Sequence, residues 1–548
     1  MIIETVRVKH FRSVLDEELN CRDLTALVGA NGSGKSSFLH GMELFYSPSP
    51  KCEKEDFYNG DTSSDMAVAI TYGDLSQDAK DLFGAYVQAD KLTVERVFSW
   101  NDSKVSSTYH GATLQCKEFQ PVRAALQVRD RGRTAREAYE KLQSISQFDT
   151  LPPWSNLGAV ENTLKKWEDA NQDQCVRLRD DGQFFGFKEV ARGYLGRFAK
   201  FLFIPAVRDA SDDTAEGKGS VITELMDLVV RSVIAGREDL MALKEEAQEK
   251  YERIIDPSQL GELTTLQSNL NQTLKNFAPE AAIELKWSPI GEIEMPTPRA
   301  EVKLVESGYA STVSRTGHGL QRAFILTLLQ HLAFASPPAT PEGEESGTVP
   351  PGPTATQLPN LVLAIEEPEL YQHPNRQRHM ARVLHELASG MTPGVAEKTQ
   401  VIYSTHSPLF VGIDRIEKIR LLRRVADSPG KPNVTRVVST TLDNVARKLW
   451  EADGSPGTEY TGETLAPRLV AVMTPWMSEG FFSEVAVLVE GEDDRAAILG
   501  VAKSKGIDLE SREICVIPCG GKTNIDKPAA IFLLLGIPCY LVWDGDKG

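Results

Sequence analysis

The stretch that decides the fold is "LTALVGANGSGKSSFLHGMELF", from Leu24 to Phe45. An apolar run typical of a buried strand leads into a glycine-rich turn, and an apolar helical pattern begins near Lys35. The turn fits G-x-x-x-x-G-K-[ST], in which backbone N–H groups surround phosphate oxygens at the N-terminus of a helix. A glycine-rich turn that arose by chance is the alternative. The flanking strand and helix both lie where a phosphate-binding loop needs them, so we expect a nucleotide site here.

The residues of this turn have separate expected roles. Lys35 would neutralise the β- and γ-phosphate oxygens, and the Ser36 hydroxyl would reach Mg²⁺. The other turn residues expected to surround the nucleotide are Asn31, Gly32, Gly34 and Ser37. The expected cofactors of this part of the chain are therefore ATP and Mg²⁺.

Two later strand candidates end in side chains that suit ATP hydrolysis. "LVLAIEEPEL" (361–370) places Glu366 and Glu367 at the end of an apolar run. Glu366 would hold Mg²⁺, directly or through water, and Glu367 would polarise the attacking water. "VIYSTHSP" (401–408) ends on His406, which is placed to contact a γ-phosphate. A strand that ends in acids, or a lone histidine, is often structural, but this order after a phosphate-binding loop favours an ATPase.

Three further strand candidates lie near the C-terminal end: "EVAVLVEGEDD" (484–494), "EICVIPCGGK" (513–522) and "CYLVWDGDKG" (539–548). Their βαβ spacing predicts a parallel sheet, which would gather acids at one carboxyl-end edge. These acids are Glu490, Asp494, Asp544 and Asp546. Such oxygen ligands suit Mg²⁺ or Mn²⁺ rather than zinc. An acidic helix start also stabilises the helix dipole, so "EGEDD" taken alone could equally be a cap.

The first set of residues resembles the ABC-type ATPases of the RecF/SMC group, in which a signature helix of one subunit caps the nucleotide held by another. The candidate signature is "SRTGHGLQRAFIL" (314–326), identified by its place just upstream of the Glu-Glu strand. By this resemblance Ser314, Gly317 and Gly319 would offer backbone donors to a γ-phosphate across the interface. An ordinary capped helix start is the alternative. The resemblance implies a homodimer or a higher homo-oligomer.

The second set resembles a Toprim domain: a Glu after the first strand, a glycine turn after the second and Asp-x-Asp after the third. An ABC-type ATPase followed by Toprim resembles the overcoming lysogenization defect (OLD) family of nucleases, which includes the nuclease subunit of Gabija-type phage defence. The resemblance implies an ATP-hydrolysing, Mg²⁺- or Mn²⁺-dependent DNA endonuclease in anti-phage defence or DNA processing. It makes Glu490 the acid/base or metal-binding residue, and makes metal ligands of Asp494, Asp544 and Asp546.

Other readings remain open at this point. The chain could be an ATP-driven DNA clamp or sensor whose Toprim half does not cut and instead recruits an effector. A primase or topoisomerase is less well supported, because neither a polymerising domain nor a transesterifying tyrosine can be placed. The expected partners are DNA, further copies of this chain, and a helicase or another defence subunit.

The expected fold class is α/β: an ABC-type P-loop ATPase with a helical insertion, followed by a Toprim domain with a parallel sheet. The expected parts are an N-terminal ATPase part (1–120), a helical insertion for dimerisation (121–285), a C-terminal ATPase part (286–425) with a disordered loop (336–358), a linker (426–480) and Toprim (481–548). Family members continue past Asp-x-Asp with another helix, a strand and a basic residue. Either the sequence is a trimmed portion or its Toprim half is incomplete, and we expect trimming.

Composition adds limits on the function. The net charge of −17, from 60 basic and 77 acidic residues, has the wrong sign for a protein that coats nucleic acid electrostatically, although a local basic groove is compatible with it. Seven cysteines without a CxxC pair argue against a disulfide framework and a zinc ribbon. No stretch reaches the roughly 18 apolar residues of a membrane span, and the N-terminus lacks a signal-peptide pattern, so we expect a cytoplasmic protein.

Overall fold

The computed structural model describes most of the chain in two compact units. The described residues are 1–101, 104–127, 131–148, 151–183, 194–206, 221–234, 238–255, 261–275, 302–333, 359–390, 396–427, 432–455, 457–472 and 474–545. The first unit contains residues 1–212, 356–391 and 396–548, and the second contains 213–355 and 392–395. Because this division separates them, the two units are described individually.

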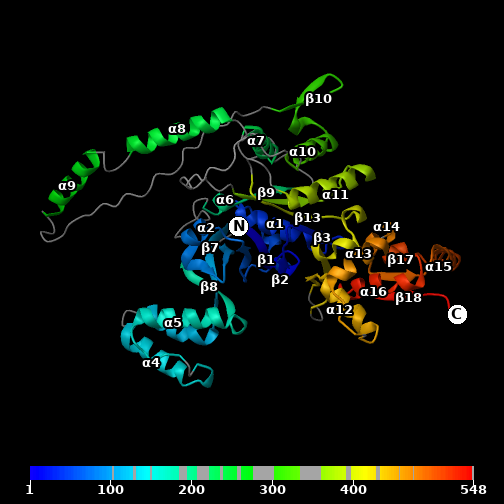
Figure 1. Cartoon of the computed structure of the whole chain (residues 1–548), viewed down its shortest axis with the longest axis horizontal. Coiled ribbons are helices and arrows are strands. Elements are labelled where there is room, and N and C mark those ends of the chain that lie inside the picture. Colours follow the sequence, from blue (N-terminus) through cyan, green and yellow to red (C-terminus); the bar gives the residue numbers. More distant parts are fainter. Residues whose placement is uncertain are drawn as a thin grey trace, which may run out of the picture. The chain divides into compact units, whose positions relative to one another are not determined.

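A largely parallel sheet forms the centre of the first unit (Figure 1). Its strands, in spatial order, are β15 (Val434–Val438), β14 (Ile419–Val425), β3 (Leu24–Val28), β13 (Thr399–Ser404), β12 (Asn360–Glu366) and β9 (Ala199–Ile204). All neighbouring pairs are parallel except β14 and β15. Every residue of β3, β12 and β13 is buried, as expected for apolar strands covered on both faces. The carboxyl ends of these three strands therefore meet at one edge.

A second, antiparallel sheet packs on the same core. Its order is β2 (Val14–Asn20), β1 (Ile2–Phe11), β4 (Met66–Gly73), β6 (Lys91–Asn101), β7 (Lys104–Gln115) and β8 (Val176–Gln183), with β5 (Val87–Gln88) paired to β6. Helix α1 (Lys35–Tyr46) contacts strands of both sheets. Its Phe38 and Met42 are fully buried in the core that the two sheets share. The helix that follows the phosphate-binding loop is thus fixed on two sides.

Arg96, a buried residue of β6, fixes the end of α1. Its guanidinium donates to the carbonyls of Leu44 and Phe45, at 2.6 and 3.2 Å, and also to the carbonyl of Ser47. These carbonyls lie at the C-terminal end of the helix, where backbone acceptors lack partners within the helix and the helix dipole favours a positive charge. Burial lowers the pKa of Arg96 from its ordinary value. The antiparallel sheet therefore supplies the C-terminal cap of α1.

The single helical insertion expected over 121–285 is interrupted by strands. Helices α3 (Gln120–Gln127), α4 (Arg131–Gln143) and α5 (Leu157–Ala170) follow β7 and form a cluster around their own core, which includes Phe119 and Phe148. The chain then returns as β8, which pairs with β7, and as β9, the edge strand of the parallel sheet. The expected insertion is corrected to two helical segments separated by strands of both ATPase sheets.

The second unit is mainly helical. It contains α7 (Val221–Ile234), α8 (Glu238–Ile255), α9 (Gly261–Lys275) and α10 (His318–Ala333), together with a hairpin of β10 (Lys303–Glu306) and β11 (Tyr309–Thr312). Helix α10 packs against α7. The predicted loop at 336–358 lies outside the described residues.

The C-terminal part of the first unit contains the predicted second parallel sheet. Its order is β17 (Ile514–Pro518), β16 (Val485–Val489) and β18 (Cys539–Val542), with α15 (Glu492–Ser504) and α16 (Asp526–Leu534) packed on it (Figure 1). The segment expected as a linker (426–480) is instead folded. It supplies β15 and the helices α12 (Leu442–Ala452), α13 (Gly462–Val472) and α14 (Pro475–Gly480). Among the described helices, none combines the length and apolar character that crossing a bilayer requires.

Candidate nucleotide and metal sites

The turn after β3 has the backbone of a phosphate-binding loop. Gly32 and Gly34 have φ values of 72° and 105°, which side chains other than glycine rarely adopt. Gly29 meets a second requirement: a Cβ at this position would lie 2.2 Å from the Leu422 carbonyl oxygen. The loop therefore needs these glycines both for its conformation and for its close approach to β14.

Lys35 is the buried cation of this loop. It is 5% exposed, and its Nζ donates to the carbonyls of Gly29 and Ala30 at 2.8 and 2.9 Å. Burial lowers the pKa of Lys35 to about 8, although the carboxylates of Glu367 and Glu369 oppose this shift. The ammonium is thus held beside the loop, and it loses its proton more easily than an ordinary lysine does.

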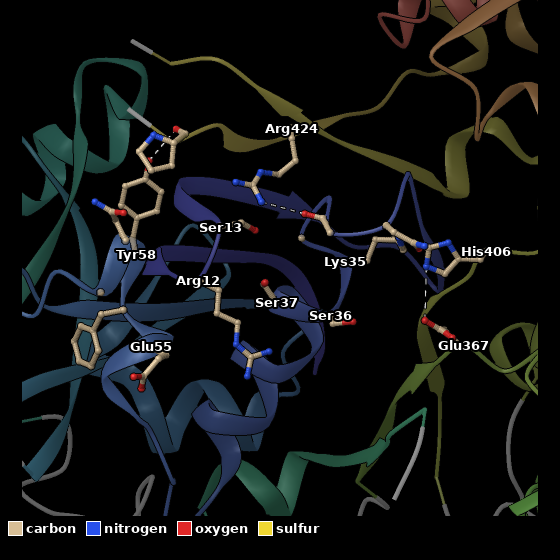
Figure 2. Close-up of a pocket in the computed structure, with 17 residues that line it drawn as sticks. Arg12, Ser13, Lys35, Ser36, Ser37, Glu55, Tyr58, Glu367, His406 and Arg424 are labelled. Atoms are coloured by element: carbon tan, nitrogen blue, oxygen red, sulfur yellow. Dashed lines mark hydrogen bonds and ion pairs between the residues drawn. The ribbon is translucent and has the colours of Figure 1, made fainter. Parts of the chain in front are cut away.

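A cavity of about 640 Å³ lies in front of the loop (Figure 2). The predicted residues that line it are Asn31, Gly32, Gly34, Lys35, Ser36, Ser37, Glu367 and His406. They come from the β3–α1 loop, from the first turn of α1, and from the residues just after β12 and β13. The structure thus brings together all but one of the nucleotide-site residues predicted in this unit, and the cavity can accept a nucleotide.

The exception is Glu366, the last residue of β12, which does not line the cavity. Its carboxylate accepts a hydrogen bond from the backbone N–H of Ala206 at 3.3 Å and lies 3.6 Å from His40 Nε2. Glu367 turns the other way because its φ is 42°, a left-handed value that is strained for a glutamate. The two adjacent carboxylates are therefore directed to different surroundings, and a role of Glu366 as Mg²⁺ ligand stays a prediction.

Glu367 and His406 lie side by side at one end of the cavity. His406 Nε2 lies 3.6 Å from Glu367 Oε1, and Figure 2 shows both side chains beside Lys35. Burial, together with the charge of Lys35, lowers the pKa of His406, so its imidazole is mainly neutral near pH 7. A neutral imidazole can accept or donate a proton beside the acid that would orient water.

Glu369 is a site residue that the sequence analysis missed. Its Oε1 accepts a hydrogen bond from the backbone N–H of His406 at 2.6 Å, and it is 8% exposed. Burial raises the pKa of this carboxyl. It joins the segments after β12 and β13 and so positions His406. The second acid two residues beyond Glu367 was a visible signal, but only the strand pairing reveals its partner.

Further cavity residues come from segments that carried no recognised motif. They are Arg12, Ser13, Glu55, Phe57, Tyr58, Asn59, Gly60, Arg424 and Pro432. Arg12 lies in the β1–β2 turn, where its Nε donates to Asp56 Oδ1 at 2.9 Å. Its φ of 50° marks a backbone that is held in an uncommon conformation. Arg12 and Arg424 bring positive charge to a cavity proposed to receive phosphates.

The signature residues lie in the second unit. Ser314 belongs to a 3₁₀ turn (Val313–Arg315), Gly317 directly precedes α10, and Gly319 lies in its first turn. The carbonyl of Gly317 accepts the backbone N–H groups of Leu320 and Gln321 at 2.9 and 3.1 Å, as at an ordinary helix start. Their contribution to a nucleotide on another subunit stays a prediction.

The Toprim sheet brings two of its predicted acids together. Glu490 follows β16 and Asp544 follows the neighbouring strand β18, and the Glu490 Oε2 accepts the backbone N–H of Asp544 at 3.4 Å. The Glu490 carbonyl also accepts the N–H of Gly521, in the turn after β17, at 2.9 Å. All three strand ends therefore meet at Glu490.

Of the other two predicted Toprim acids, Asp494 caps a helix and Asp546 lies outside the described residues. Asp494 Oδ2 accepts the backbone N–H of Gly491 at 2.9 Å, so this carboxylate caps the start of α15. Asp546 lies outside the described residues, which end at Gly545. Within the described ranges, no group of three or more His, Cys, Asp or Glu side chains is close enough to hold a metal ion. The carboxylates of Glu490 and Asp544 have the chemistry of Mg²⁺ or Mn²⁺ ligands, and Asp546 would complete the set.

Comparison with known proteins agrees with the two expected domains. Residues 1–411 match the family described as "AAA ATPase domain". Residues 481–546 match "Overcoming lysogenization defect protein-like, TOPRIM domain". The chain is 24% identical over 556 residues to the "OLD nuclease" of Thermus scotoductus (strain ATCC 700910 / SA-01), covering 100% of this chain and 82% of that protein. It is 22% identical over 552 residues to the "Old nuclease" of Escherichia phage P2, covering 99% of this chain and 77% of that protein.

Solved structures with a weaker likeness include the SMC head domain from Thermotoga maritima, with 12% identity and a TM-score of 0.29 over 80% of this chain and 99% of that chain. The SmcHead bound to the C-winged helix domain of ScpA gives 11% identity and a TM-score of 0.33 over 80% of this chain and 98% of that chain. These scores are too low to support a conclusion about the fold. The assignment follows from the family matches: the chain belongs to the AAA ATPase domain family and carries a Toprim domain of the overcoming lysogenization defect type, as the sequence resemblance predicted.

Proposed function

We propose that this protein binds and hydrolyses ATP and cuts DNA as a metal-dependent endonuclease, in anti-phage defence or DNA processing. The observation that carries the nuclease proposal is the meeting of Glu490 and Asp544 at the carboxyl ends of adjacent parallel strands. Carboxylate oxygens brought to such an edge would suit a divalent cation. The match to a Toprim domain of the OLD type supports the same activity.

In the ATPase half, the residues of the phosphate-binding loop and those after β12 and β13 have proposed roles. The backbone N–H groups of Gly32 and Gly34 and the ammonium of Lys35 would bind the phosphates, and Ser36 would reach Mg²⁺. Glu367 would take a proton from the attacking water, and His406, 3.6 Å away, would orient the γ-phosphate. Glu369 would hold the backbone of His406 in place.

In the Toprim half, Glu490, Asp494, Asp544 and Asp546 would hold Mg²⁺ or Mn²⁺. A pair of such ions, when bound, activates water and stabilises the leaving 3′ oxygen of a cut strand. Glu490 would bind metal or move a proton, and its carbonyl contact with Gly521 fixes its backbone beside the turn after β17. The exposed position of Asp544 leaves this edge open to a large substrate such as DNA.

We also propose that the chain acts as a homodimer. Helices α8 and α9 carry large apolar side chains that are more than a third exposed. On α8 they include Leu243 and Ile254, at 50% and 70% exposure, and on α9 they include Leu266 and Leu270, one helical turn apart. Exposed apolar side chains gathered on helices commonly mark an interface between proteins. Light scattering of the purified protein tests this, and Ile254→Glu should shift the mass towards a monomer.

Plasmid nicking with Mg²⁺ or Mn²⁺ tests the nuclease proposal. We expect wild-type protein to convert supercoiled DNA to nicked or linear forms, and Asp544→Ala to leave it intact while ATP hydrolysis persists. Equal cleavage by both proteins would refute the assignment. DNA binding and ATP hydrolysis without cleavage under either metal would instead favour the clamp or sensor.

A further inference from the structure

Strand β14 of the ATPase sheet lies directly against the phosphate-binding loop. It pairs in parallel with β3, and the Leu422 carbonyl lies so close to Gly29 that no side chain fits there. The next residue but one, Arg424, lines the nucleotide cavity (Figure 2). Its guanidinium donates to the Gly32 carbonyl at 3.4 Å and to the Asn433 carbonyl at 2.7 Å. Arg424 therefore touches the loop that would receive the phosphates.

Arg423, the residue before it, contacts the Toprim sheet instead. Neighbouring residues of a strand project to opposite faces, so Arg423 and Arg424 leave β14 in opposite directions. The Arg423 guanidinium donates to the Gly536 carbonyl at 2.8 Å and to the Glu484 carbonyl at 3.4 Å, and it forms an ion pair with the Glu484 carboxylate. This side chain is 17% exposed, so the ion pair is shielded more than one on an open surface.

The two positions that Arg423 holds are the starting points of the Toprim strands. Glu484 directly precedes β16, and Gly536 lies in the turn before β18. The opposite ends of these two strands lead to Glu490 and Asp544. Because β16 and β18 are paired residue by residue, a shift at their starting ends changes where their carboxyl ends lie. Arg423 is thus placed to influence the spacing of the proposed metal ligands.

We propose that Arg424 and Arg423 couple the nucleotide cavity to the Toprim edge: Arg424 senses bound phosphate, and Arg423 transmits the resulting shift of β14 to β16 and β18. The inference rests on the proposed function, since it names how nucleotide regulates that metal edge. A phosphate offers Arg424 charge-assisted hydrogen bonds that are stronger than its single long bond to Gly32. Nucleotide thereby gains a differential interaction with two positions of β14, which a conformational change requires.

Hydrogen exchange on this chain tests the coupling without relying on cleavage. Wild-type protein is compared with and without AMP-PNP and Mg²⁺, and exchange is followed over residues 484–490 and 536–544. We expect nucleotide to change the exchange rate there by about threefold or more, as is common when a local opening equilibrium is altered. Arg423→Ala should lose this change while it binds AMP-PNP with wild-type affinity. Arg424→Gln should lose it even when nucleotide is saturating.

Arg436 provides a matched control. It lies opposite Arg423 in the β14–β15 pairing and forms ion pairs with Glu17 and Asp427, neither of which belongs to the Toprim sheet. Arg436→Ala should keep the nucleotide-dependent change. If Arg423→Ala unfolds, Glu484→Gln removes the same ion pair from an exposed partner and should give the same loss.

The outcomes separate the coupling from the nuclease proposal. A nucleotide-dependent change that persists in both Arg423→Ala and Glu484→Gln, or that is absent from wild-type protein, overturns the coupling. A change that depends on Arg423 in a protein that never cuts DNA supports the coupling and refutes the nuclease. DNA cleavage by a wild-type protein whose hydrogen-exchange rates in the Toprim sheet do not change with nucleotide supports the nuclease and overturns the coupling.

Discussion

At the nucleotide site, the reactive side chains are held by the protein itself, whereas at the Toprim edge they converge with little support. Lys35 is buried and bonded to two carbonyls, and His406 is tied through its backbone to Glu369. Glu490 and Asp544 share one long contact at 3.4 Å, and Asp544 is exposed. Both sites use the carboxyl ends of parallel strands, where such sheets place their ligands. The difference indicates that the ATPase site is preorganised by folding, while the described residues of the Toprim edge are held by fewer contacts.

The largest effect is expected from a substitution at the Toprim edge, where the acids have fewer contacts. Asp544→Ala should lower DNA cleavage by at least about a thousandfold, because it removes a proposed ligand of the ions that activate water. ATP hydrolysis should change less than about twofold, since the cavity does not include Asp544. Nicking and phosphate-release assays on one preparation measure both. Parallel loss of the two activities would mean that Asp544 supports the fold of both sites and not the cleavage step alone.

A smaller effect is expected from a substitution at the nucleotide site. Glu367→Gln keeps the shape of the side chain but removes the base that would orient water, so kcat for ATP hydrolysis should fall by about 100- to 1,000-fold. The affinity for ATP should stay nearly the same, because Lys35 and the loop remain. Glu366→Gln is the neighbouring comparison: loss of a Mg²⁺ ligand there should raise the Mg²⁺ concentration needed for hydrolysis. Wild-type hydrolysis by Glu367→Gln would contradict the role of Glu367.

Substitutions of Asp494 can show whether this residue acts as a helix cap or as a metal ligand. Asp494→Asn keeps an oxygen that can accept the Gly491 N–H, but it removes the negative charge that a divalent ion favours. We expect cleavage to fall by about tenfold, with a higher metal concentration needed for half-maximal rate and an unchanged melting temperature. Asp494→Ala should lower both cleavage and stability. Wild-type cleavage by the Asn variant would leave Asp494 with the capping role alone.

The smallest expected effect is a pH dependence at the preorganised site. The pKa of Lys35 is about 8, and phosphates bind the charged ammonium, so ATP affinity should fall as pH rises above 8, by at most about tenfold per pH unit for one proton. Below that pH the affinity should be nearly constant, since Lys35 is already charged. Lys35→Arg, whose side chain stays protonated, should flatten the dependence between pH 8 and 9 in a fluorescent-nucleotide titration. An unchanged slope in this variant would assign the pH dependence to another group.

The parts of the fold that the sequence predicted are those where local pattern is strong. The buried runs ending at Val28, Glu366 and Ser404 are continuous and apolar, and glycines mark the loop between β3 and α1. The three Toprim strands were visible for the same reason. Polar strand β8, "VRLRDDGQ", has no such pattern, and pairing with β7 rather than its own propensity makes it a strand. Strand β15 was hidden in the supposed linker because it completes a sheet begun far earlier in the chain.

The site was predictable to the extent that motifs lie at strand ends. Arg12, Tyr58 and Arg424 reach the cavity from turns and from β14, so their relevance depends on tertiary packing that no local spacing reveals. Glu369 carried a partial signal in "EEPEL", but its bond to the His406 backbone requires β12 and β13 to be neighbours. The division of Glu366 from Glu367 likewise depends on one left-handed backbone angle that sequence does not encode simply.

The hydrogen bonds that Arg96 donates to the last carbonyls of α1 limit how small a nucleotide-binding fragment of this protein can be. The helix begins at the phosphate-binding loop, and the carbonyls at its other end accept hydrogen bonds from a strand some fifty residues later in the chain. A fragment cut after α1 would therefore leave three carbonyls without the arginine that binds them. A minimal ATP-binding piece must therefore retain β6 as well as the loop. Engineers who wish to graft this loop elsewhere would need to supply a comparable counter-charge at the far end of the helix.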